Sequence, residues 1–552
     1  MSEILTAIAI LFILAGPFLF LANRYNIAAA PLLIVAGIIG GIFIDEQLAL
    51  ELAELGIALL VFAFGVRLQF SDIEEVITES EIVAFAQILV LGALGVGFGM
   101  GMGVSLAESL FIGVAVALSS TMVGTALLET EIRLNLMYGR LGQSIQLIQD
   151  LVAVLFILIV SAGVFELDPA VLQIGYGVVF VLGAVVVNRY VFKIVSRLSG
   201  GSDELLIIGT IAILVLFIGA AVTVDVPIVV GAFAAGLAIK YDPVEYLGLL
   251  NGLKSIEDFF VAIFFMTVGA LVVIPFVEIG PVESVTKLVL VGGIVVLTAV
   301  IKPLMTVVLL IKRGYEARTA TLVGVSTDQV SEFALVIAIQ ASLVGLLSQD
   351  VFDAIILAAA ITMITTSMTQ RHSERLYQRI RSHGLLRSTH RKIDSSSHVP
   401  ADISDHVIVI GYGRAGSRAV DTLEELGHPY VVIENDPALI GEVRANCEAY
   451  VIGDAVEAYS WEVAQVEQAR AVVSMTPSMS VSEYLLSLDL DCVLVLRSVT
   501  EADALSLMDR GATYSIVPDL LAAEELIVDL SAVLSGRIDI ETFRERGLTY
   551  HN

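Results

Sequence analysis

Residues 1 to about 370 alternate between apolar runs, most of them about as long as a bilayer is thick, and short polar segments. A transmembrane helix needs about 20 consecutive, predominantly apolar residues. The mean hydropathy is +0.89 and 57% of the residues are hydrophobic, which excludes an ordinary soluble protein. We therefore predict a polytopic α-helical membrane domain over residues 1–370. Its thirteen predicted spans are residues 4–22, 27–44, 50–69, 81–103, 106–128, 141–163, 170–192, 204–223, 226–241, 257–276, 283–311, 317–346 and 351–370.

The rest of the chain is predicted to form a linker and a second domain. Residues 371–403 are polar, first basic and then rich in Ser. The arginines of this linker either lie against anionic lipid headgroups or belong to an ordinary juxtamembrane tether. Residues 404–552 have the composition of a soluble domain and are numerous enough to form their own core.

The distribution of Lys and Arg indicates the orientation of the membrane domain, because these residues accumulate in cytoplasmic loops. With the N-terminus outside, the outer segments between spans contain no Lys or Arg, whereas the inner segments contain twelve. Lys287, near the outer end of its run, is the residue that does not fit. An odd number of spans puts the C-terminal domain in the cytoplasm. We predict a multi-pass protein of the plasma membrane.

The C-terminal domain is strongly acidic. Residues 401–552 contain 26 Asp or Glu and 9 Arg but no Lys, so they carry about −17 of the chain's net charge of −28. This balance excludes nucleic acid as a partner, because phosphate neutralisation needs a basic patch. An acidic, lysine-free surface is typical of proteins from a high-salt cytoplasm. The two cysteines, Cys447 and Cys492, indicate no disulfide framework and suit a reducing compartment.

A carboxylate lies near the middle of the sixth apolar run. Gln149 and Asp150 occur in LGQSIQLIQDLVAVLFILIVSAG, residues 141–163. A charged group at this depth costs roughly 2.5 to 3.5 kcal/mol on insertion scales, so such residues usually face a polar cavity. We interpret Asp150 as a cation or proton site. The alternative is a structural Asp that braces a neighbouring helix.

Polar residues also interrupt the fifth and the twelfth runs. The fifth contains Ser119, Ser120 and Thr121, and the twelfth contains Asp328 and Glu332 together with Gln and hydroxyl residues. Hydroxyls alone prove little, because they bond to their own helix. Two carboxylates are tolerated only beside a cavity, and paired broken helices are typical of a transporter's midplane site. The two interruptions lie seven spans apart, as expected for two inverted repeats that each supply one broken, crossing helix.

Lys302 is the remaining charge in the middle of a run. Since a lone ammonium in lipid is unfavourable, we expect it to pair with Asp150 or with the acidic cluster of Asp328 and Glu332. The alternative is a Lys side chain that extends to the interface, although Lys302 is about ten residues from the cytoplasmic Lys312. No His precedes His372, so carboxylates must carry any protons across the membrane domain.

The succession LAELGIALLVFAFGVRLQFSDI, LSSTMVG, IQDLVAVL, IVVGAFAAGLAI and SEFALVIA resembles the Kef-type monovalent cation/proton antiporters along nearly the whole membrane domain. With its acidic C-terminal domain, the chain is similar to those of halophilic archaea. The resemblance implies thirteen helices in two inverted repeats, a homodimer, and exchange of K⁺ for H⁺ between two crossed, unwound helices.

The resemblance also assigns residues to the ion site. It makes Asp150 the shared cation and proton site and Gln149 its neighbour in ion coordination, with the hydroxyl residues 119–121 at the crossing. Lys302 resembles the basic residue that such antiporters place close to the Asp. One departure is that Val330 and Ser331 stand where the family commonly has Gly-Gly before Glu-Phe. We therefore expect a differently shaped second break and an acidic site enlarged by Asp328.

The C-terminal domain begins with a nucleotide-binding pattern. Residues 406–437 are predicted as strand, glycine-rich turn, helix and strand, with Gly411, Gly413 and Gly416 as G-x-G-x-x-G and Glu434 ending the second strand. Glycines at a helix N-terminus allow close approach of phosphates, and the acid binds ribose hydroxyls. Further strands are expected at 449–455, 469–476, 491–499 and 513–518. The pattern predicts an α/β Rossmann-like, doubly wound parallel sheet.

In GYGRAG, IENDP, VIGDA and GATYSIVPDLLAAEELIVDL, residues 404–535 resemble the RCK (KTN, TrkA-N) regulatory domain. Such domains dimerise through a helix like the last of these segments, and they gate K⁺ channels and transporters when a nucleotide binds. The resemblance implies an adenine nucleotide, NAD(H), AMP or ATP, as regulatory ligand. Its residues would be Gly411, Tyr412, Gly413, Arg414, Ala415, Gly416, Glu434, Asn435, Asp436, Asp454 and Ala455.

These patterns predict a secondary antiporter rather than an enzyme. One carboxylate that binds either a cation or a proton explains obligatory exchange, with K⁺ as the first expectation and Na⁺ as the alternative. An RCK-gated channel would need a filter such as T-V-G-Y-G, which the sequence lacks. A membrane-tethered NAD(P)-dependent reductase would need a substrate domain and an acid–base group, and neither is evident after the predicted sheet.

Overall fold

The computed structural model describes residues 2–25, 27–68, 80–129, 132, 136–161, 167–224, 226–240, 246–277, 279–382, 391–488, 490–541 and 543–544. The chain divides into two compact units, one of Met1–Ile132 with Tyr138–Ser388 and one of Arg133–Met137 with Thr389–Asn552. Residues 383–390 of the predicted linker, the last residues of the predicted spans 50–69, 141–163 and 226–241, and the C-terminal residues 545–552 lie outside the described residues.

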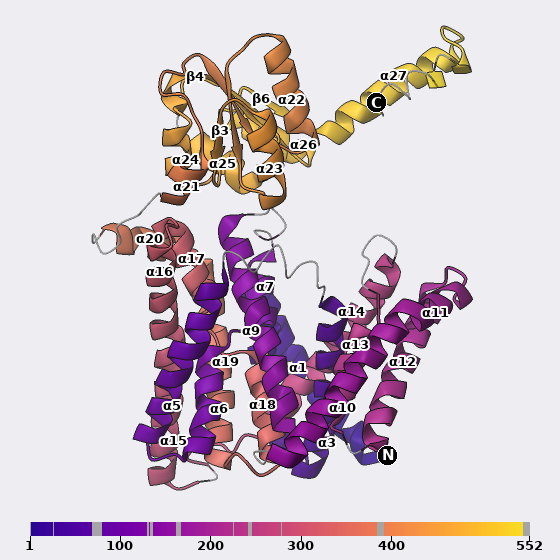
Figure 1. Cartoon of the computed structure of the whole chain (residues 1–552), viewed down its shortest axis with the longest axis vertical. Coiled ribbons are helices and arrows are strands. Elements are labelled where there is room, and N and C mark those ends of the chain that lie inside the picture. The colour runs from indigo at the N-terminus through magenta and orange to yellow at the C-terminus, as the bar shows by residue number, and fades with distance from the viewer. Residues whose placement is uncertain are drawn as a thin grey trace. The chain divides into compact units, whose positions relative to one another are not determined.

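The first unit is a bundle of helices (Figure 1). Their bounds are α1 Ser2–Tyr25, α2 Ala29–Gly40, η1 Gly41–Phe43, α3 Glu46–Arg67, η2 Gln87–Leu91, α5 Gly92–Gly101, α6 Leu106–Ala117, α7 Thr121–Leu127, α9 Met137–Ser161, α10 Leu167–Val186, η3 Val187–Val191, α11 Phe192–Leu198, α12 Asp203–Thr223, α13 Ile228–Leu237, α14 Leu247–Ala270, α15 Pro281–Val296, η4 Leu297–Ile301, α16 Lys302–Lys312, α17 Ala317–Ser326, α18 Glu332–Leu343, α19 Gln349–Arg371 and α20 Ser373–Ser382.

Each of the thirteen predicted apolar runs contains helix in the part that the structure describes. Nine helices among the described residues are long and apolar enough to cross a membrane, and three shorter apolar helices occur at Ala29–Phe43, Ile228–Leu237 and Glu332–Leu343. The helix α14 also carries Lys254, Glu257 and Asp258 in its first half. The predicted membrane fold class is confirmed.

Glycines allow some of these helices to pack with their backbones in contact. A Cβ built on Gly37 of α2 would overlap with the backbone of Met266 of α14, and one on Gly236 of α13 would overlap with the carbonyl of Phe62 of α3. Small residues let membrane helices approach closely and gain van der Waals contact. These two contacts fix α2 against α14 and α13 against α3.

The two polar interruptions are breaks between helices. The chain is extended between α6 and α7, and Ser120 Oγ accepts a hydrogen bond from the Val123 amide at 3.2 Å to cap α7. It is again non-helical between α17 and α18, where Ser331 Oγ accepts from the Phe333 amide at 3.0 Å. A Ser that follows the break satisfies amides that the second half-helix would leave unpaired. In both breaks, therefore, a Ser side chain caps the N-terminus of the second half-helix.

In the part of the chain that the structure describes, three of the long membrane helices also contain a π-helical turn. The turns are η2 in the fourth run, η3 in the seventh and η4 in the eleventh. The turns η2 and η4 lie seven spans apart, as the two breaks do. Single π turns inside α-helices frequently occur at functional sites.

The second unit contains one parallel sheet covered by helices (Figure 1). The strand order is β3-β2-β1-β4-β5-β6, and Ile408 at the centre of β1 pairs with Val431 of β2 and Val472 of β4. This confirms the predicted Rossmann-like sheet. The strands are β1 His406–Ile410, β2 Tyr430–Glu434, β3 Tyr450–Ile452, β4 Ala469–Ser474, β5 Val493–Arg497 and β6 Tyr514–Ile516; the helices are α21 Arg391–Ser396, α22 Arg414–Glu425, α23 Pro437–Asn446, α24 Ala458–Val463, η5 Val466–Gln468, α25 Met479–Ser487, α26 Glu501–Asp509 and α27 Pro518–Leu534.

The helix α27 extends away from the sheet of its own unit (Figure 1). Seven of its large apolar side chains are exposed: Leu520, Leu521, Leu526, Ile527, Val528, Leu530 and Leu534. Contiguous exposed apolar patches mark interaction sites more often than single exposed apolar residues do.

Candidate functional site

Asp150 lies on α9, beside the first break. Its side chain is 1% exposed, and Thr121 Oγ1 donates a hydrogen bond to its Oδ2 at 2.5 Å. The other oxygen, Oδ1, is buried and accepts no hydrogen bond from any described residue. Buried polar atoms are nearly always paired, so an unpaired carboxylate oxygen at this depth calls for a ligand or a functional role.

Glu332, the first residue of α18, lies beside Asp150. Its Oε1 accepts a hydrogen bond from the Met122 amide at 3.1 Å, while Oε2 is buried and has no partner among the described residues. Both carboxylates line one cavity of about 340 Å³. Arg67 and Thr121 line it too, and Arg67 also pairs with the buried Glu257 of α14 at 2.7 Å. The cavity therefore contains two unpaired carboxylate oxygens and one cation on its wall.

The two breaks contact each other directly. Ser119 Oγ donates to the Thr327 carbonyl at 2.9 Å, and Gln329 Nε2 donates to the Ser120 carbonyl at 3.0 Å. Lys302 Nζ contributes to both breaks, since it donates to the carbonyls of Leu118 at 2.9 Å and Gln329 at 3.1 Å. The breaks expose carbonyls that no helix satisfies, and the ammonium pairs with them.

The structure places Lys302 and Asp328 differently from the sequence-based expectation. Carbonyls of the breaks and Ser119 Oγ at 3.4 Å accept the hydrogen bonds of Lys302, and its interaction with Asp328 of the acidic cluster is electrostatic, without a contact of ion-pair length. Asp328 does not line the cavity; it accepts hydrogen bonds from Thr366 and Thr369 of α19 instead.

Gln149 does not line the cavity either. Its Oε1 accepts from the Ser119 amide at 2.8 Å, and its Nε2 donates to Gln87 Oε1 at 2.5 Å. Adjacent residues of a helix point about 100° apart, so Gln149 and Asp150 face different neighbours. Both ends of the amide are thus already engaged within the protein.

Sequence reasoning missed several residues here. Arg67 is one of the twelve basic residues of the inner segments, and Glu257 begins the predicted span 257–276, so nothing in the pattern links the two. Gln87 gives only a weak signal, because it is a single amide in an apolar run. The pair formed by Lys287 and Asp353, at 2.5 Å, was missed because the two charges lie 66 residues apart in the sequence.

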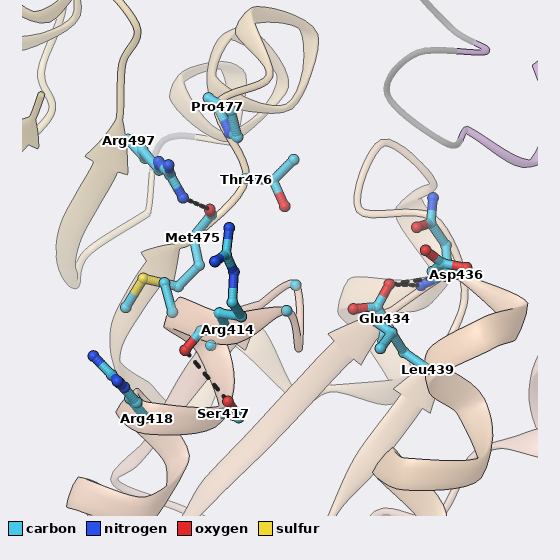
Figure 2. Close-up of a pocket in the computed structure, with 15 residues that line it drawn as sticks. Arg414, Ser417, Arg418, Glu434, Asp436, Leu439, Met475, Thr476, Pro477 and Arg497 are labelled. Atoms are coloured by element: carbon cyan, nitrogen blue, oxygen red, sulfur yellow. Dashed lines mark hydrogen bonds between the residues drawn. The ribbon is translucent and has the colours of Figure 1, made fainter. Parts of the chain in front are cut away.

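A pocket of about 1000 Å³ lies at the carboxyl ends of the strands in the second unit. Figure 2 shows Arg414 and Arg497 on one side of it and Glu434 and Asp436 on the other. Ligands of doubly wound sheets bind at this edge, between the strands where the order reverses, here β1 and β4. The predicted loop residues Gly411, Gly413, Arg414, Ala415, Gly416, Glu434, Asn435 and Asp436 all line the pocket.

The glycines have the geometry that the loop requires. Gly411 has φ of +86°, and a Cβ on Gly416 would overlap with the Gly411 carbonyl. Gly413 precedes α22 and has open space around it. The Glu434 carboxylate accepts from the amides of Tyr412 at 2.5 Å and of Asn435 and Asp436 at 2.8 Å. It therefore braces the loop as well as lining the pocket.

Tyr412, Asp454 and Ala455 are predicted ligand residues whose side chains do not line this pocket. The Tyr412 ring packs in an apolar cluster with Cys447, where burial raises the pKa of Tyr412 to about 12 and that of Cys447 to about 11. Ala455 belongs to the core on the other side of the sheet, and Asp454 is buried and accepts a hydrogen bond from Asn435.

The pocket contains residues that the glycine pattern did not predict. Thr476 and Pro477 follow β4, and Arg497 ends β5. With Arg414 and Arg418, Arg497 supplies the third guanidinium group of the pocket, in a domain that is otherwise strongly acidic. Guanidinium groups match phosphate geometry, so the residues present fit an anionic nucleotide. The sequence could have indicated these residues, because they lie at the carboxyl ends of β4 and β5, the edge at which doubly wound sheets bind their ligands.

Residues 8–371 match the family described as "Sodium/hydrogen exchanger, transmembrane". The chain belongs to this exchanger family. Residues 407–518 of the exchanger match the TrkA-N domain. The predicted architecture, a helical antiporter domain followed by a Rossmann-like RCK domain, is thereby confirmed. The protein is a transporter of the cation/proton antiporter class and not an enzyme.

Three relatives illustrate the similarity. "Putative cation/proton antiporter YbaL" of Escherichia coli is 25% identical over 544 residues, 94% of this exchanger and 95% of the relative. "K(+) efflux antiporter 6" of Arabidopsis thaliana is 28% identical over 60% of this chain and 56% of its own length. "Putative K(+) efflux antiporter KefB" of Alkalimonas amylolytica is 23% identical over 94% of this chain and 80% of its own. They support the predicted resemblance to Kef-type antiporters.

Proposed function

We propose that the protein exchanges K⁺ for protons at Asp150 by alternating access. The observation that carries this proposal is the buried, unpaired Oδ1 of Asp150 beside the unpaired Oε2 of Glu332 in one cavity. A carboxylate in such a place holds either a proton or a cation, because binding one removes the negative charge that attracts the other. Competition for one group couples the two fluxes.

The membrane residues have distinct roles in this proposal. Asp150 is the group that gains and loses the proton, with Thr121 holding one of its oxygens. Glu332 supplies a second oxygen for a cation that has shed water. Lys302 neutralises the carbonyls of the two breaks. K⁺ is favoured over Na⁺ because two of the relatives above are named as K⁺ efflux antiporters.

The second unit is proposed to regulate exchange through an adenine nucleotide bound at the glycine loop. The glycine geometry, the three arginines and the position at the strand ends support this role. Two copies of the chain are proposed to associate through α27, whose exposed apolar face would then be covered.

The proposed orientation follows the distribution of Lys and Arg. The N-terminus lies outside, and the C-terminal domain lies in the cytoplasm of a plasma-membrane protein. The proposed domains are residues 1–370 and 404–552, joined by a linker at 371–403.

The test is proton movement in proteoliposomes that contain the purified protein, with K⁺, Na⁺ or neither, and with NAD(H), AMP, ATP or no nucleotide. Asp150→Asn should abolish cation-dependent proton movement, since an amide cannot release a proton. Asp258→Asn is a matched control, because Asp258 is exposed and pairs only with the neighbouring Lys254 among the described residues. Exchange that survives Asp150→Asn would show the central claim to be wrong.

A further inference from the structure

We propose that a closed ring of buried polar residues positions the proposed ion site. The ring consists of Gln87, Ser119, Gln149, Lys302 and Thr306, contributed by the fourth, fifth, sixth and eleventh apolar runs. These are positioning residues: they act on the relative placement of Asp150 and Thr121 rather than on the ion. The inference rests on the proposed function of Asp150.

Hydrogen bonds connect the five residues without a gap. Thr306 Oγ1 donates to the Lys302 carbonyl at 2.9 Å and accepts from Gln87 Nε2 at 2.6 Å. Gln87 Oε1 accepts from Gln149 Nε2 at 2.5 Å, and Gln149 Oε1 accepts from the Ser119 amide at 2.8 Å. Lys302 Nζ donates to Ser119 Oγ at 3.4 Å and closes the ring.

All five residues are fully buried, at 0% exposure. Water therefore does not replace a lost partner, and each bond holds its two segments at a fixed distance. In a buried network, removing one member leaves an unsatisfied polar group on its neighbours. The ring should accordingly respond to substitution as one unit.

The ring acts on the ion site through two neighbouring pairs. The Ser119 amide is bonded to Gln149, and Thr121, two residues later and the first residue of α7, is bonded to Asp150, the residue after Gln149. The two bonds tie the end of the break and the start of α7 to the same helix, α9. If the first bond loosens, the start of α7 shifts against α9, and the distance between Thr121 and Asp150 changes with it.

Two π-helical turns border the ring. Gln87 is the first residue of η2, and Lys302 directly follows η4. A π turn inserts one extra residue and so rotates the positions after it relative to a regular helix. The turns thus decide which side chains of the fourth and eleventh runs face the break, which gives them a function in this site.

Thr306 provides a sharp test, because Thr298 lies two turns earlier in the same run. Both are buried, but Thr306 Oγ1 belongs to the ring, whereas Thr298 Oγ1 has no hydrogen-bond partner among the described residues. Thr306→Val and Thr298→Val are therefore the same chemical change inside and outside the ring. Thr306→Ser keeps the hydroxyl and serves as the conservative variant.

The measurements are the KM for K⁺ in proteoliposomes and the apparent K⁺ affinity from K⁺-dependent thermal stabilisation of the purified protein. We expect Thr306→Val to weaken both about tenfold, the equivalent of one hydrogen bond. Thr306→Ser and Thr298→Val should match the wild type. Gln87→Leu should resemble Thr306→Val, and the double variant should be little worse than either, because the ring is already open.

The outcomes separate this inference from the proposed function. If Thr306→Val and Gln87→Leu lower the melting temperature but leave K⁺ affinity at the Thr298→Val value, the ring is merely structural and the inference is wrong. If either variant is too unstable to purify, the other decides the question by the same comparison. If Asp150→Asn still exchanges K⁺ for protons, the proposed function is wrong. The effect of Thr306→Val on K⁺-dependent thermal stabilisation still shows whether the ring affects K⁺ binding.

Discussion

Lys287, whose charge did not fit the predicted topology, is paired inside the membrane unit. Its Nζ lies 2.5 Å from Asp353 Oδ2 and 3.3 Å from Asp350 Oδ1, and the side chains of Lys287 and Asp353 are 1% and 0% exposed. Gln349 Nε2 and the Val273 amide donate to the other Asp353 oxygen. The pair joins α15 to α19, and its hydrogen bonds offset the desolvation of both charges.

We expect Asp353→Asn to destabilise the protein strongly, by about 3 to 5 kcal/mol, because it leaves a buried ammonium without its main partner. Thermal unfolding of the purified protein measures this. Asp350→Asn is the control and should cost about 1 kcal/mol or less, since that carboxylate is 68% exposed. The double variant Lys287→Met/Asp353→Leu should recover most of the loss. Equal effects of Asp350→Asn and Asp353→Asn would contradict this account.

At the residue scale, the sequence indicated a functional site where a charged or polar side chain occurs in an apolar run. Asp150 stood out because a carboxylate in an apolar run is unfavourable, and the structure places it beside a cavity. The partners of Lys302 and Gln149 were not predictable, because they are backbone groups of a break and an amide from a distant run. Residue type shows that a buried polar group needs a partner, but not which partner it finds.

At the scale of elements, the glycine loop before α22 allows nucleotide binding to be tested separately from fold stability. Gly413 lines the pocket, has φ of −65° and has no atom within 4 Å of a built Cβ, so the fold should accept Ala. A methyl group there would occupy space needed by phosphates close to the loop. We expect Gly413→Ala to weaken adenine-nucleotide binding at least tenfold, measured by calorimetry on the full chain, with an unchanged melting temperature.

Gly441→Ala is the matched control for this loop variant. Gly441 also has open space around it, but it lies in α23 and does not line the pocket. Ala in a helix interior is favoured over Gly by about 1 kcal/mol, so a slight rise in melting temperature and unchanged nucleotide affinity are expected. If Gly413→Ala binds nucleotide as tightly as Gly441→Ala does, the loop does not hold the phosphates.

The two breaks could be predicted from the sequence, whereas the π turns could not. Both breaks were predicted, because Ser, Thr, Asp and Glu in an apolar run mark backbone that leaves the helix, and Ser120 and Ser331 cap the following half-helices. The π turns η2, η3 and η4 were not predicted, because their residues are those of ordinary membrane helices. An extra residue in a turn is a consequence of packing rather than of a local motif.

At the scale of the whole molecule, hydropathy predicted the membrane fold class, and the strand–loop–helix pattern predicted the sheet. The helices of the membrane unit pack through contacts between distant residues, such as Gly37 with Met266. Apolar periodicity contains no information on such pairings, since α2, the helix of Gly37, is apolar on every face. Assembly of two chains through α27 is likewise an expectation from family resemblance and exposed surface.

The association of two copies through α27 should depend on salt. Residues 401–552 carry about −17, so two copies repel, and the Debye length falls from about 10 Å at 0.1 M salt to about 3 Å at 1 M. We expect disulfide cross-linking of Ser531→Cys in the full chain to increase as KCl is raised from about 0.1 M to about 1 M. Ile527→Asp should abolish it by placing a charge on the apolar face.

The control for the assembly test is Leu505→Asp, because Leu505 is an equally apolar, exposed residue on α26. It should cross-link as the parent does, since α26 lies outside the proposed contact. Cross-linking that persists in Ile527→Asp would place the contact elsewhere. Cross-linking that falls as KCl rises would mean that attraction between charges, rather than burial of the apolar face against like-charge repulsion, holds the two copies together.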